Sequence, residues 1–542
     1  MFDKRLFLEE AILSDHHDAQ RSRRADYVAT LLMLLEFGVE LSPGVRSRAL
    51  AAAWARRDSA LADHLLSRDA WGLAEVVRAL QLLDSGRQAR ALERRVTRLE
   101  QDGRTRKRRL GPLRSQLADL RREGHAGSLS GALARRVRRW VSTIPADKLE
   151  YYAITFPFEP WRRLADLLHL APSDFQLTWF LGHVFGEPAP RGTMTAACGE
   201  VDADRLADVA RAHHVPYSYL RTRALPAPAA LREAVASYES LDTLLWFYEE
   251  LRCEATDQRI AARLEAGETP EFGYGKLIER LLALRDLKVS FWTQLLPVAD
   301  RMLQGVRLPL DPPVVVLGDA SSSMTSAIRV ATIIGSLLTV FSRADLRFFN
   351  HELIEPPVVP RTIHDVLTVT DTVKATGSTA PAAALWPSLS RRELVRSFVV
   401  VTDEEENTQC QGQRFDAMYK RYREQVFPAQ ATFVSFIRQQ SEGQMVRALR
   451  LQELPCRQFR LDNQRPDLTK LDSILGMMAT DGPLFAERVE TVAGWLGDAS
   501  IAEVVPRLRA LVGAAAADEA SAAPNAAGRG LLGRLVSTLR SR

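Results

Sequence analysis

The chain has 542 residues, more than a single hydrophobic core usually holds, so its length alone predicts two to four domains. Its composition, with 46% hydrophobic and 26% charged residues and a net charge of +5, is that of an ordinary globular protein. The longest apolar stretch covers about twelve residues, against roughly 20 for a membrane-spanning helix, and no secretory signal opens the chain. We therefore expect a soluble, cytoplasmic protein with no membrane span.

Residues 1–303 have the hydrophobic spacing of α-helices throughout. Leu31, Leu35 and Val39, for example, recur at four-residue intervals. Turns that contain proline and glycine, such as residues 186–192, divide the helices, and no strand pattern interrupts them. The pattern predicts an all-α helical-repeat solenoid, although the repeats have no strict period.

One segment of this helical part carries most of the positive charge. Between Arg87 and Arg139 there are 17 Arg or Lys against 5 Asp or Glu, a local net charge of +12. Such a block suits a polyanion, because neutralising phosphates releases counterions. A solvated helical hairpin whose arginines pair with acidic neighbours is equally compatible with it, and both interpretations stay open. The candidate RNA contacts in the block are Arg104, Arg106, Lys107, Arg108, Arg109, Arg135, Arg136, Arg138 and Arg139.

After residue 310 the pattern changes to alternating strands and helices. Strands that are apolar on both faces indicate a parallel sheet covered by helices on each side, so residues 313–500 are expected to form a doubly wound α/β domain. The expected strands are 314–317, 346–349, 397–402 and 431–437, and the expected helices are 325–341, 380–386, 415–426 and 484–496.

The end of the chain has low complexity. Residues 513–528 are rich in alanine and predict a disordered linker. Residues 529–542 form a basic amphipathic tail, with Leu531, Leu535 and Leu539 on one helical face. This tail suits a peptide that docks on a partner or a membrane surface, and it suits a frayed end equally well.

Polar side chains gather at the strand ends of the predicted α/β domain. Asp319, Ser321 and Ser323 follow the first strand, Thr379 lies in a glycine-containing loop before a helix, and Asp403 ends the strand FVVVTD. Since ligands of open α/β sheets bind at the carboxyl ends of the strands, we expect these five residues to lie close together.

Oxygen ligands of this kind suit Mg²⁺ or another divalent cation. Two carboxylates balance the charge of the ion, and the hydroxyls add oxygens without adding charge, so the ion stays electrophilic toward an acidic group. No His, Lys or Cys is evident in these loops as a general base or nucleophile. The residues therefore predict a docking site in a protein that is not an enzyme.

This set of five residues resembles the metal-ion-dependent adhesion site (MIDAS) of von Willebrand factor A domains. The match consists of D-x-S-x-S, a Thr in a later loop and a strand that ends in Asp, and it covers residues 313–496. The resemblance implies that Asp319, Ser321, Ser323, Thr379 and Asp403 hold the metal. It also implies that the metal grips an acidic residue of a partner protein.

The order of the two parts resembles the sixty-kilodalton Ro autoantigen family, or TROVE proteins. The segments GDASSSM, ATGSTAPAAALW and VVTDEEENTQ match family segments, as does WRRLADLLHLAP at residues 161–172. This resemblance implies a ring of HEAT-like helices closed by the A domain, in a ribonucleoprotein that binds RNA. It adds His169 to the candidate RNA contacts. The excess of arginine over lysine, 64 to 8, is typical of a GC-rich bacterial genome.

The sequence also departs from this family. Residues 153–160 carry no cation, Trp161 stands where Y RNA-binding members have a His, and residues 241–251 have aromatic and acidic residues in place of an Arg. Two functions therefore stay open. The first is a Ro-like protein that binds RNA, with small non-coding RNA as a candidate. The second is a protein-interaction scaffold that uses only the metal site, as A domains do beside MoxR-type AAA+ ATPases.

Overall fold

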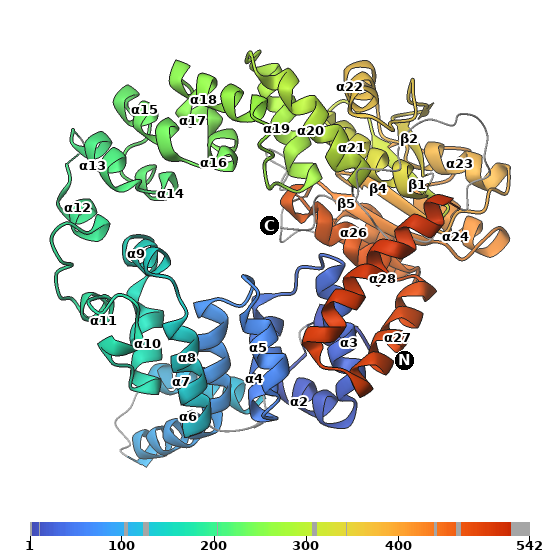
Figure 1. The fold of residues 1–542 in the computed structure, drawn as a ribbon. Coiled ribbons are helices and arrows are strands. Elements are labelled where there is room, and N and C mark those ends of the chain that lie inside the picture. The colour runs from blue at the N-terminus through green and yellow to red at the C-terminus, as the bar shows by residue number, and fades with distance from the viewer. Residues whose placement is uncertain are drawn as a thin grey trace.

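The computed structural model describes residues 3–9, 11–101, 107–122, 129–202, 204–305, 312–342, 344–437, 442–461 and 468–521. Over these ranges the elements follow one another round a closed circuit, in which the last two helices lie beside helices near the N-terminus (Figure 1). A long helical part comes first, and an α/β domain with a six-stranded sheet follows it. This arrangement confirms the predicted fold class.

The helical part has no strand among its described residues. Some of its helices are amphipathic: in α8, Leu133, Val137 and Val141 are buried, whereas Arg135 and Arg139 face solvent. The α-helices are α1 (Arg5–Leu8), α2 (Leu13–Ser22), α3 (Arg24–Glu36), α4 (Pro43–Ala55), α5 (Ser59–Leu66), α6 (Leu73–Gln101), α7 (Lys107–Arg122), α8 (Gly131–Ser142), α9 (Ala146–Thr155), α10 (Phe158–Leu168), α11 (Phe180–Val184), α12 (Met194–Glu200), α13 (Leu206–His213), α14 (Tyr217–Leu220), α15 (Ala229–Tyr238), α16 (Leu241–Trp246), α17 (Tyr248–Leu251), α18 (Glu254–Glu265), α19 (Tyr274–Asp286) and α20 (Leu296–Gly305). Short 3-10 helices are Pro172–Asp174 and Trp292–Leu295.

The sheet of the α/β domain has the strand order β3-β2-β1-β4-β5-β6, and only β3 runs antiparallel to its neighbour. Every residue of β1 is buried, as expected for a strand covered on both faces. The chain adds β2 on one side of β1 and β4 on the other, which is where open α/β sheets bind ligands. The strands are β1 (Val314–Asp319), β2 (Asp345–Phe349), β3 (Leu353–Ile354), β4 (Ser397–Thr402), β5 (Gln430–Ser435) and β6 (Cys456–Arg460).

All four predicted strands and all four predicted helices of this domain are present. The sequence did not reveal β3, which has two residues, or β6, whose half-buried sequence CRQFR lacks an apolar run. The helices are α21 (Thr325–Ser342), α22 (Ile363–Thr372), α23 (Ala382–Ser390), α24 (Phe415–Gln425), α25 (Gln444–Leu451), α26 (Leu471–Ala479), α27 (Pro483–Asp498) and α28 (Ile501–Ser521), with a 3-10 helix at Leu468–Lys470.

The circuit closes where the last helices meet the first. Although α27 lies within the range 313–500 predicted for the α/β domain, it packs against α3, and α28 contacts α3 and α5 (Figure 1). The rings of Phe37 and Phe485 meet with centroids 5.5 Å apart. Asp481 accepts hydrogen bonds from Lys4 at 2.8 Å and from Arg457 at 2.5 Å. The N-terminal helices are thus fastened to the end of the α/β domain.

Backbone atoms approach closely at this junction. The Glu40 amide donates a hydrogen bond to the Ser473 hydroxyl at 2.9 Å. One turn further along α26, Gly476 faces the carbonyl group of Phe37, and a Cβ at this glycine would overlap that oxygen. Glycine is therefore required here by contact between two elements.

A second junction joins α19 and α20 to the α/β domain. The guanidinium group of Arg285 donates to both carboxylate oxygens of Asp371, at 3.0 and 2.9 Å. The Asp300 carboxylate accepts a hydrogen bond from the amide of Ile363, at 2.7 Å, where α22 begins. The domain is held from both ends of the helical part.

The end of the chain differs from the sequence prediction. Helix α28 continues to Ser521, into the alanine-rich residues 513–528 that were expected to be a disordered linker. Alanine has the highest helix propensity, which explains why this stretch extends a helix. The predicted tail at residues 529–542 lies outside the described residues. In the part of the chain that the structure describes, no helix is long and apolar enough to cross a membrane.

The junction between α28, α3 and α5 contains a histidine that gives it a defined acid sensitivity. Arg68 donates to the imidazole of His64 at 3.2 Å and to Glu36 at 2.5 Å, and Glu36 also accepts from Arg509 of α28 at 3.1 Å. Burial, and secondarily the charge of Arg68, lowers the pKa of His64 to about 4. The folded protein therefore binds a proton on His64 more weakly than the unfolded chain does, in which the histidine pKa is near 6.5.

Stability should therefore be full above pH 6.5 and should fall as the pH drops toward 4. In His64→Gln the side chain can still accept a hydrogen bond from Arg68 but does not titrate. We expect the free energy of unfolding of this variant to fall by about 1 kcal/mol less than that of wild type between pH 7 and pH 5, after allowance for solvent screening. Thermal unfolding at the two pH values measures this difference. An unchanged pH dependence in the variant would show that His64 is not the responsible group.

Candidate metal centre and polyanion surface

The first loop of the candidate metal centre continues directly from β1. Asp319 ends the strand and is fully buried, Ser321 is almost fully buried, and Ser323 is exposed in the turn before α21. The Ser321 amide donates a hydrogen bond to Oδ1 of Asp319 at 2.9 Å. This local bond turns the chain sharply, so that the carboxylate and the two serines occupy one short loop.

A second loop is joined to the first by backbone hydrogen bonds. The amide of Thr376 donates to the carbonyl of Ala320 at 2.8 Å, and the hydroxyl of Ser322 donates to the carbonyl of Gly377 at 3.0 Å. Gly377 has a φ of +77°, which favours glycine, and a Cβ there would press on the ring of His351. These contacts bring the buried Thr379 to the same edge of the sheet as Asp319.

The third loop follows β4. Thr402, the last residue of the strand, donates its hydroxyl hydrogen to Oδ2 of Asp319 at 2.6 Å. The half-buried Asp403 comes next and accepts a hydrogen bond from the Glu405 amide at 3.1 Å. The amide of Thr379 donates to the side chain of Asn407 at 2.9 Å, which ties the second loop to the third.

The electrostatics of the three loops favour a cation. Burial raises the pKa of Asp319 to about 6; hydrogen bonds from Thr402 and Ser321 oppose the rise, and the nearby charge of Asp403 adds to it. Neither Asp319 nor Asp403 forms an ion pair with a Lys, Arg or His among the described residues. A buried carboxylate beside a second one is unfavourable without a compensating positive charge.

The donor atoms fit a hard divalent cation. The hydroxyls of Ser323 and Thr379 have no hydrogen-bond partner within the described ranges, so they are available as ligands. Among those residues no three His, Cys, Asp or Glu side chains are grouped to hold a metal ion. The donors at this edge of the sheet are therefore two carboxylates and neutral hydroxyl oxygens, a set that suits Mg²⁺.

Two residues that support this centre were not predicted from the sequence. Thr402 orients the Asp319 carboxylate, and Asn407 links two of the loops. A threonine at a strand end is common, so Thr402 gave no signal of its own. Asn407 lies in the segment VVTDEEENTQ, whose resemblance to family segments was the one available hint.

The predicted RNA contacts are dispersed in the structure. Arg104 and Arg106 lie outside the described residues, and the side chains of Lys107, Arg108 and Arg109 in the first turn of α7 also do. Arg135 and Arg139 are exposed on one face of α8, and neither has an ion pair among the described residues. These two arginines are free to meet a polyanion.

Two of the other predicted contacts, Arg138 and Arg136, take part in the fold. Arg138 donates to the carbonyl of Leu168 at 2.5 Å and to that of His169 at 3.2 Å, and thereby caps the end of α10. Arg136 forms an ion pair with Asp63, in which Nη1 lies 3.7 Å from Oδ1. His169 is exposed, with a left-handed backbone at φ 51°.

Trp161, at the position of the family's histidine, belongs to the core. It is fully buried, and its ring lies 5.1 Å from that of Phe180 and 5.8 Å from that of Phe175, centroid to centroid. Tyr248 lies in residues 241–251, the second segment that departs from the family, and it is also fully buried. Trp161 thus packs in the core, whereas Tyr248 packs against Phe291 and also donates a hydrogen bond from its hydroxyl to Asp257 at 2.6 Å.

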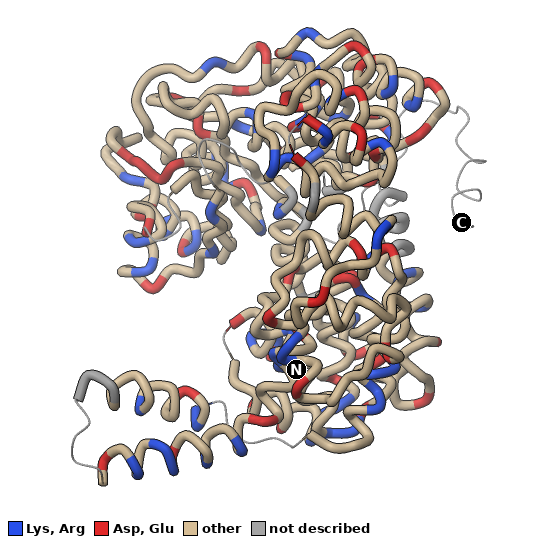
Figure 2. Tube along the Cα trace, turned by 90° about the vertical axis from the view of Figure 1, so that its left-hand side faces the viewer, with Lys and Arg blue, Asp and Glu red and all other residues tan. Residues whose placement is uncertain are grey.

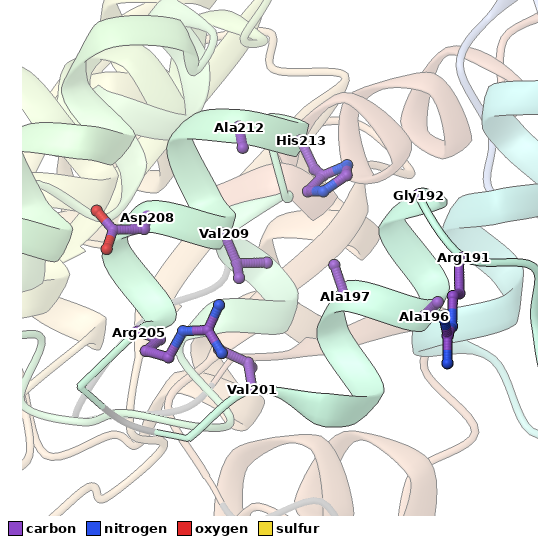
Figure 3. A pocket seen from close by; sticks show the side chains of 10 residues that line it. All are labelled: Arg191, Gly192, Ala196, Ala197, Val201, Arg205, Asp208, Val209, Ala212 and His213. Atoms are coloured by element: carbon purple, nitrogen blue, oxygen red, sulfur yellow. The ribbon is translucent and has the colours of Figure 1, made fainter.

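A groove that the sequence did not reveal lies between α12 and α13 (Figure 3). It has a volume of about 530 Å³. Its floor consists of small apolar side chains such as Ala197 and Val209. Arg205, which directly precedes α13, and Asp208 and His213 of α13 also line it (Figure 3). The groove therefore combines an apolar floor with charged and polar side chains at its edges.

Fold and site together define a class of protein: a closed circuit of helices completed by an α/β domain, with five oxygen-bearing side chains at the carboxyl edge of its parallel strands. No family model matches the chain, and no curated protein matches it. One similar solved structure is the crystal structure of the Ro (RSR) protein of Deinococcus radiodurans, with a TM-score of 0.47 and 14% identity, over 80% of this chain and 93% of that one. That protein is a Ro protein, the family that the sequence motifs resemble. At this identity and score, the likeness carries no argument about the roles of individual residues.

Proposed function

We propose that this protein binds RNA on its helical part and docks a partner protein through a divalent metal ion on its α/β domain. One observation carries the RNA half of the proposal. The segment α6–α8 holds the +12 block, and α6 and α7 form a hairpin that projects from the rest of the molecule (Figure 2). A projecting basic surface is accessible to a long polyanion.

The groove between α12 and α13 supports the choice of RNA as the polyanion. The ring of His213 offers a stacking surface to a nucleobase, and Arg205 suits a phosphate, beside Asp208, the one acidic side chain among the described residues that line the groove. Unstacked bases of this kind are available in single-stranded RNA and in loops.

Freshly purified protein is expected to contain nucleic acid and to bind RNA with an affinity that falls steeply as salt increases, because phosphate contacts release counterions. The absorbance ratio at 260 and 280 nm and a filter-binding titration between about 50 and 200 mM salt test this expectation. Protein free of nucleic acid that also fails to bind RNA at the lowest salt would refute RNA binding.

The metal half of the proposal uses Asp319, Ser321, Ser323, Thr379 and Asp403 as ligands. A bound divalent ion supplies a Lewis-acidic centre that accepts a carboxylate oxygen of a partner. The chain's own residues hold the loops in place: Thr402 fixes the orientation of the Asp319 carboxylate, and the bond from Ser322 to Gly377 fixes the second loop. We infer a docking role for this site, because these groups position a ligand.

A second candidate function is a scaffold that docks proteins through the metal site and binds no RNA. The observation that favours it is the use of Arg138 and Trp161 within the fold, which removes them from RNA recognition. A suitable partner presents an acidic side chain, as in complexes with AAA+ ATPases. Capture of that partner should then depend on divalent metal and on Asp319, whose variants are described in the Discussion.

A further inference from the structure

The outer half of α6 leaves the body of the protein together with α7. From residue 86 to the end of α6, Val96 is the only buried side chain among the described residues, and Leu117 of α7 is buried opposite it. The two helices contact each other and form the projecting hairpin seen from the side in Figure 2. The hairpin therefore uses its apolar side chains for its own seam.

The acidic side chains of this outer half of α6 are also used within the hairpin. Glu93 pairs with Arg121 of α7, and Glu100 pairs with Arg114 of α7, both at 2.6 Å. Neither glutamate is left to neutralise the arginines on the remainder of α6.

Those arginines form a row, which we call the α6 arginine row: Arg87, Arg90, Arg94 and Arg98. Residues four apart lie on one face of a helix, and at 100° per residue this row lies on the face opposite Val96. All four side chains are exposed. Arg87, at the base, pairs with Asp84, whereas the other three have no ion pair among the described residues.

The spacing of the row fits a phosphate backbone. Residues four apart on a helix are separated by about 6 Å along its axis. A strand lying along α6 could therefore place phosphates beside successive arginines of the row, without any contact to the bases.

The composition of the row argues against a lipid surface. Helices that lie in a membrane interface insert an apolar face beside their cations. The residues between the arginines on this side, Ala91 and Thr97, are small, and the apolar face of α6 is covered by α7. Only the cations are offered to a ligand.

We propose that the α6 arginine row binds the sugar–phosphate backbone of RNA without regard to sequence. This inference rests on the RNA binding proposed above and specifies the surface and the part of the RNA that it contacts. Within the row, Arg90, Arg94 and Arg98 make the phosphate contacts. Arg87 stays paired with Asp84.

The test compares two triple variants of the full-length protein. The first, R90Q/R94Q/R98Q, removes the free cations of the row and keeps residues with good helix propensity. The second, R259Q/R421Q/R447Q, removes three exposed arginines that have no ion pair among the described residues and lie on other elements. Both variants change the net charge equally, so only the location of the charge differs.

Binding of a fluorescent RNA duplex of about 20 base pairs is measured as a function of salt concentration. Each phosphate contact contributes about 0.9 to the slope of log affinity against log salt. We expect the slope of log affinity against log salt to be shallower by about 2–3 for the row variant. Its affinity near 100 mM salt should be lower by roughly tenfold or more, and equally so for two duplexes of unrelated sequence. The control variant should stay within about twofold of wild type.

The outcomes separate this inference from the proposed function. If wild type binds no RNA, both fail. If wild type binds RNA and the two variants lose affinity equally, or neither loses any, RNA binding stands and the role of the row is refuted. Row-dependent binding to vesicles with anionic lipids, without row-dependent RNA binding, also overturns the inference. Far-ultraviolet circular dichroism of both variants checks that α6 remains helical.

Discussion

Replacing Gly476 by alanine is expected to destabilise the protein by about 1–3 kcal/mol and to loosen the packing of α26 against the segment that follows α3. The added Cβ would overlap the Phe37 carbonyl oxygen and would also lie 3.3 Å from Val39. A backbone oxygen cannot rotate away as the end of a flexible side chain can. The junction must therefore separate or distort, and with it the contact that closes the circuit.

A matched control is available on the next helix. Gly494 lies on the exposed side of α27, and no atom lies within 4 Å of an added Cβ. Gly494→Ala should stabilise the protein by about 0.5–1 kcal/mol, because alanine lowers the entropy of the unfolded chain and favours a helix. Calorimetric unfolding of both variants, with hydrogen exchange of the α1–α3 amides, gives the comparison. A melting temperature of Gly476→Ala equal to that of Gly494→Ala would contradict close packing at Gly476.

The second large effect is expected at Asp319. Loss of a hydrogen bond that supports a metal ligand typically lowers metal affinity roughly 10–100-fold. Asp319→Asn changes the ligand itself, so it should lower the affinity for Mn²⁺ or Mg²⁺ by more than this. Thr402→Val, which removes only that supporting bond from Asp319, should fall within this 10–100-fold range. Asp371→Asn, which alters an exposed ion pair with Arg285, serves as the control and should bind metal normally. Titration calorimetry and manganese paramagnetic resonance measure the affinities.

The same substitution should stabilise the metal-free protein. Because burial raises the pKa of Asp319 to about 6, the folded state holds a proton that the unfolded chain releases near pH 3.8. Stability therefore falls as the pH rises through this window, and the full penalty persists at pH 7. Asparagine avoids it, so we expect a gain of roughly 1–3 kcal/mol in the presence of a chelator. Loss of metal binding with gain of stability is the pattern of a functional carboxylate, and unchanged metal affinity would exclude Asp319 as a ligand.

This variant also tests the scaffold function. If a partner docks through the metal, both chelator and Asp319→Asn should abolish its capture, whether or not the helical part binds RNA. Capture that survives both treatments would place the partner elsewhere on the molecule.

The sequence predicted those parts of the fold whose signals are local. The strands 314–317 and 397–402 were recognisable because buried parallel strands are apolar on both faces, and Asp319 follows the first of them directly. The support from Thr402 was not recognisable, since its acceptor lies 83 residues away along the chain. The pairing of α27 with α3 depends on tertiary contacts that no short pattern encodes.

The arginine-rich block shows the same limit at the level of single side chains. The sequence gives Arg138 and Arg139 as neighbours of equal character. In the structure Arg138 caps α10, whereas Arg139 is exposed, because adjacent residues of a helix point in directions about 100° apart. Which cations remain available for a ligand depends on their position around each helix.

The closure of the circuit has a consequence for synthesis of the chain on the ribosome. Lys4 and its partner Asp481 are separated by 477 residues. At about 5–20 residues per second, roughly 25–95 s pass before that partner is made. During this interval the face of α3 that later packs on α27 has no native cover, so the nascent chain exposes this surface until α27 has been synthesised. Any chain that stops before residue 483 would leave this face permanently exposed.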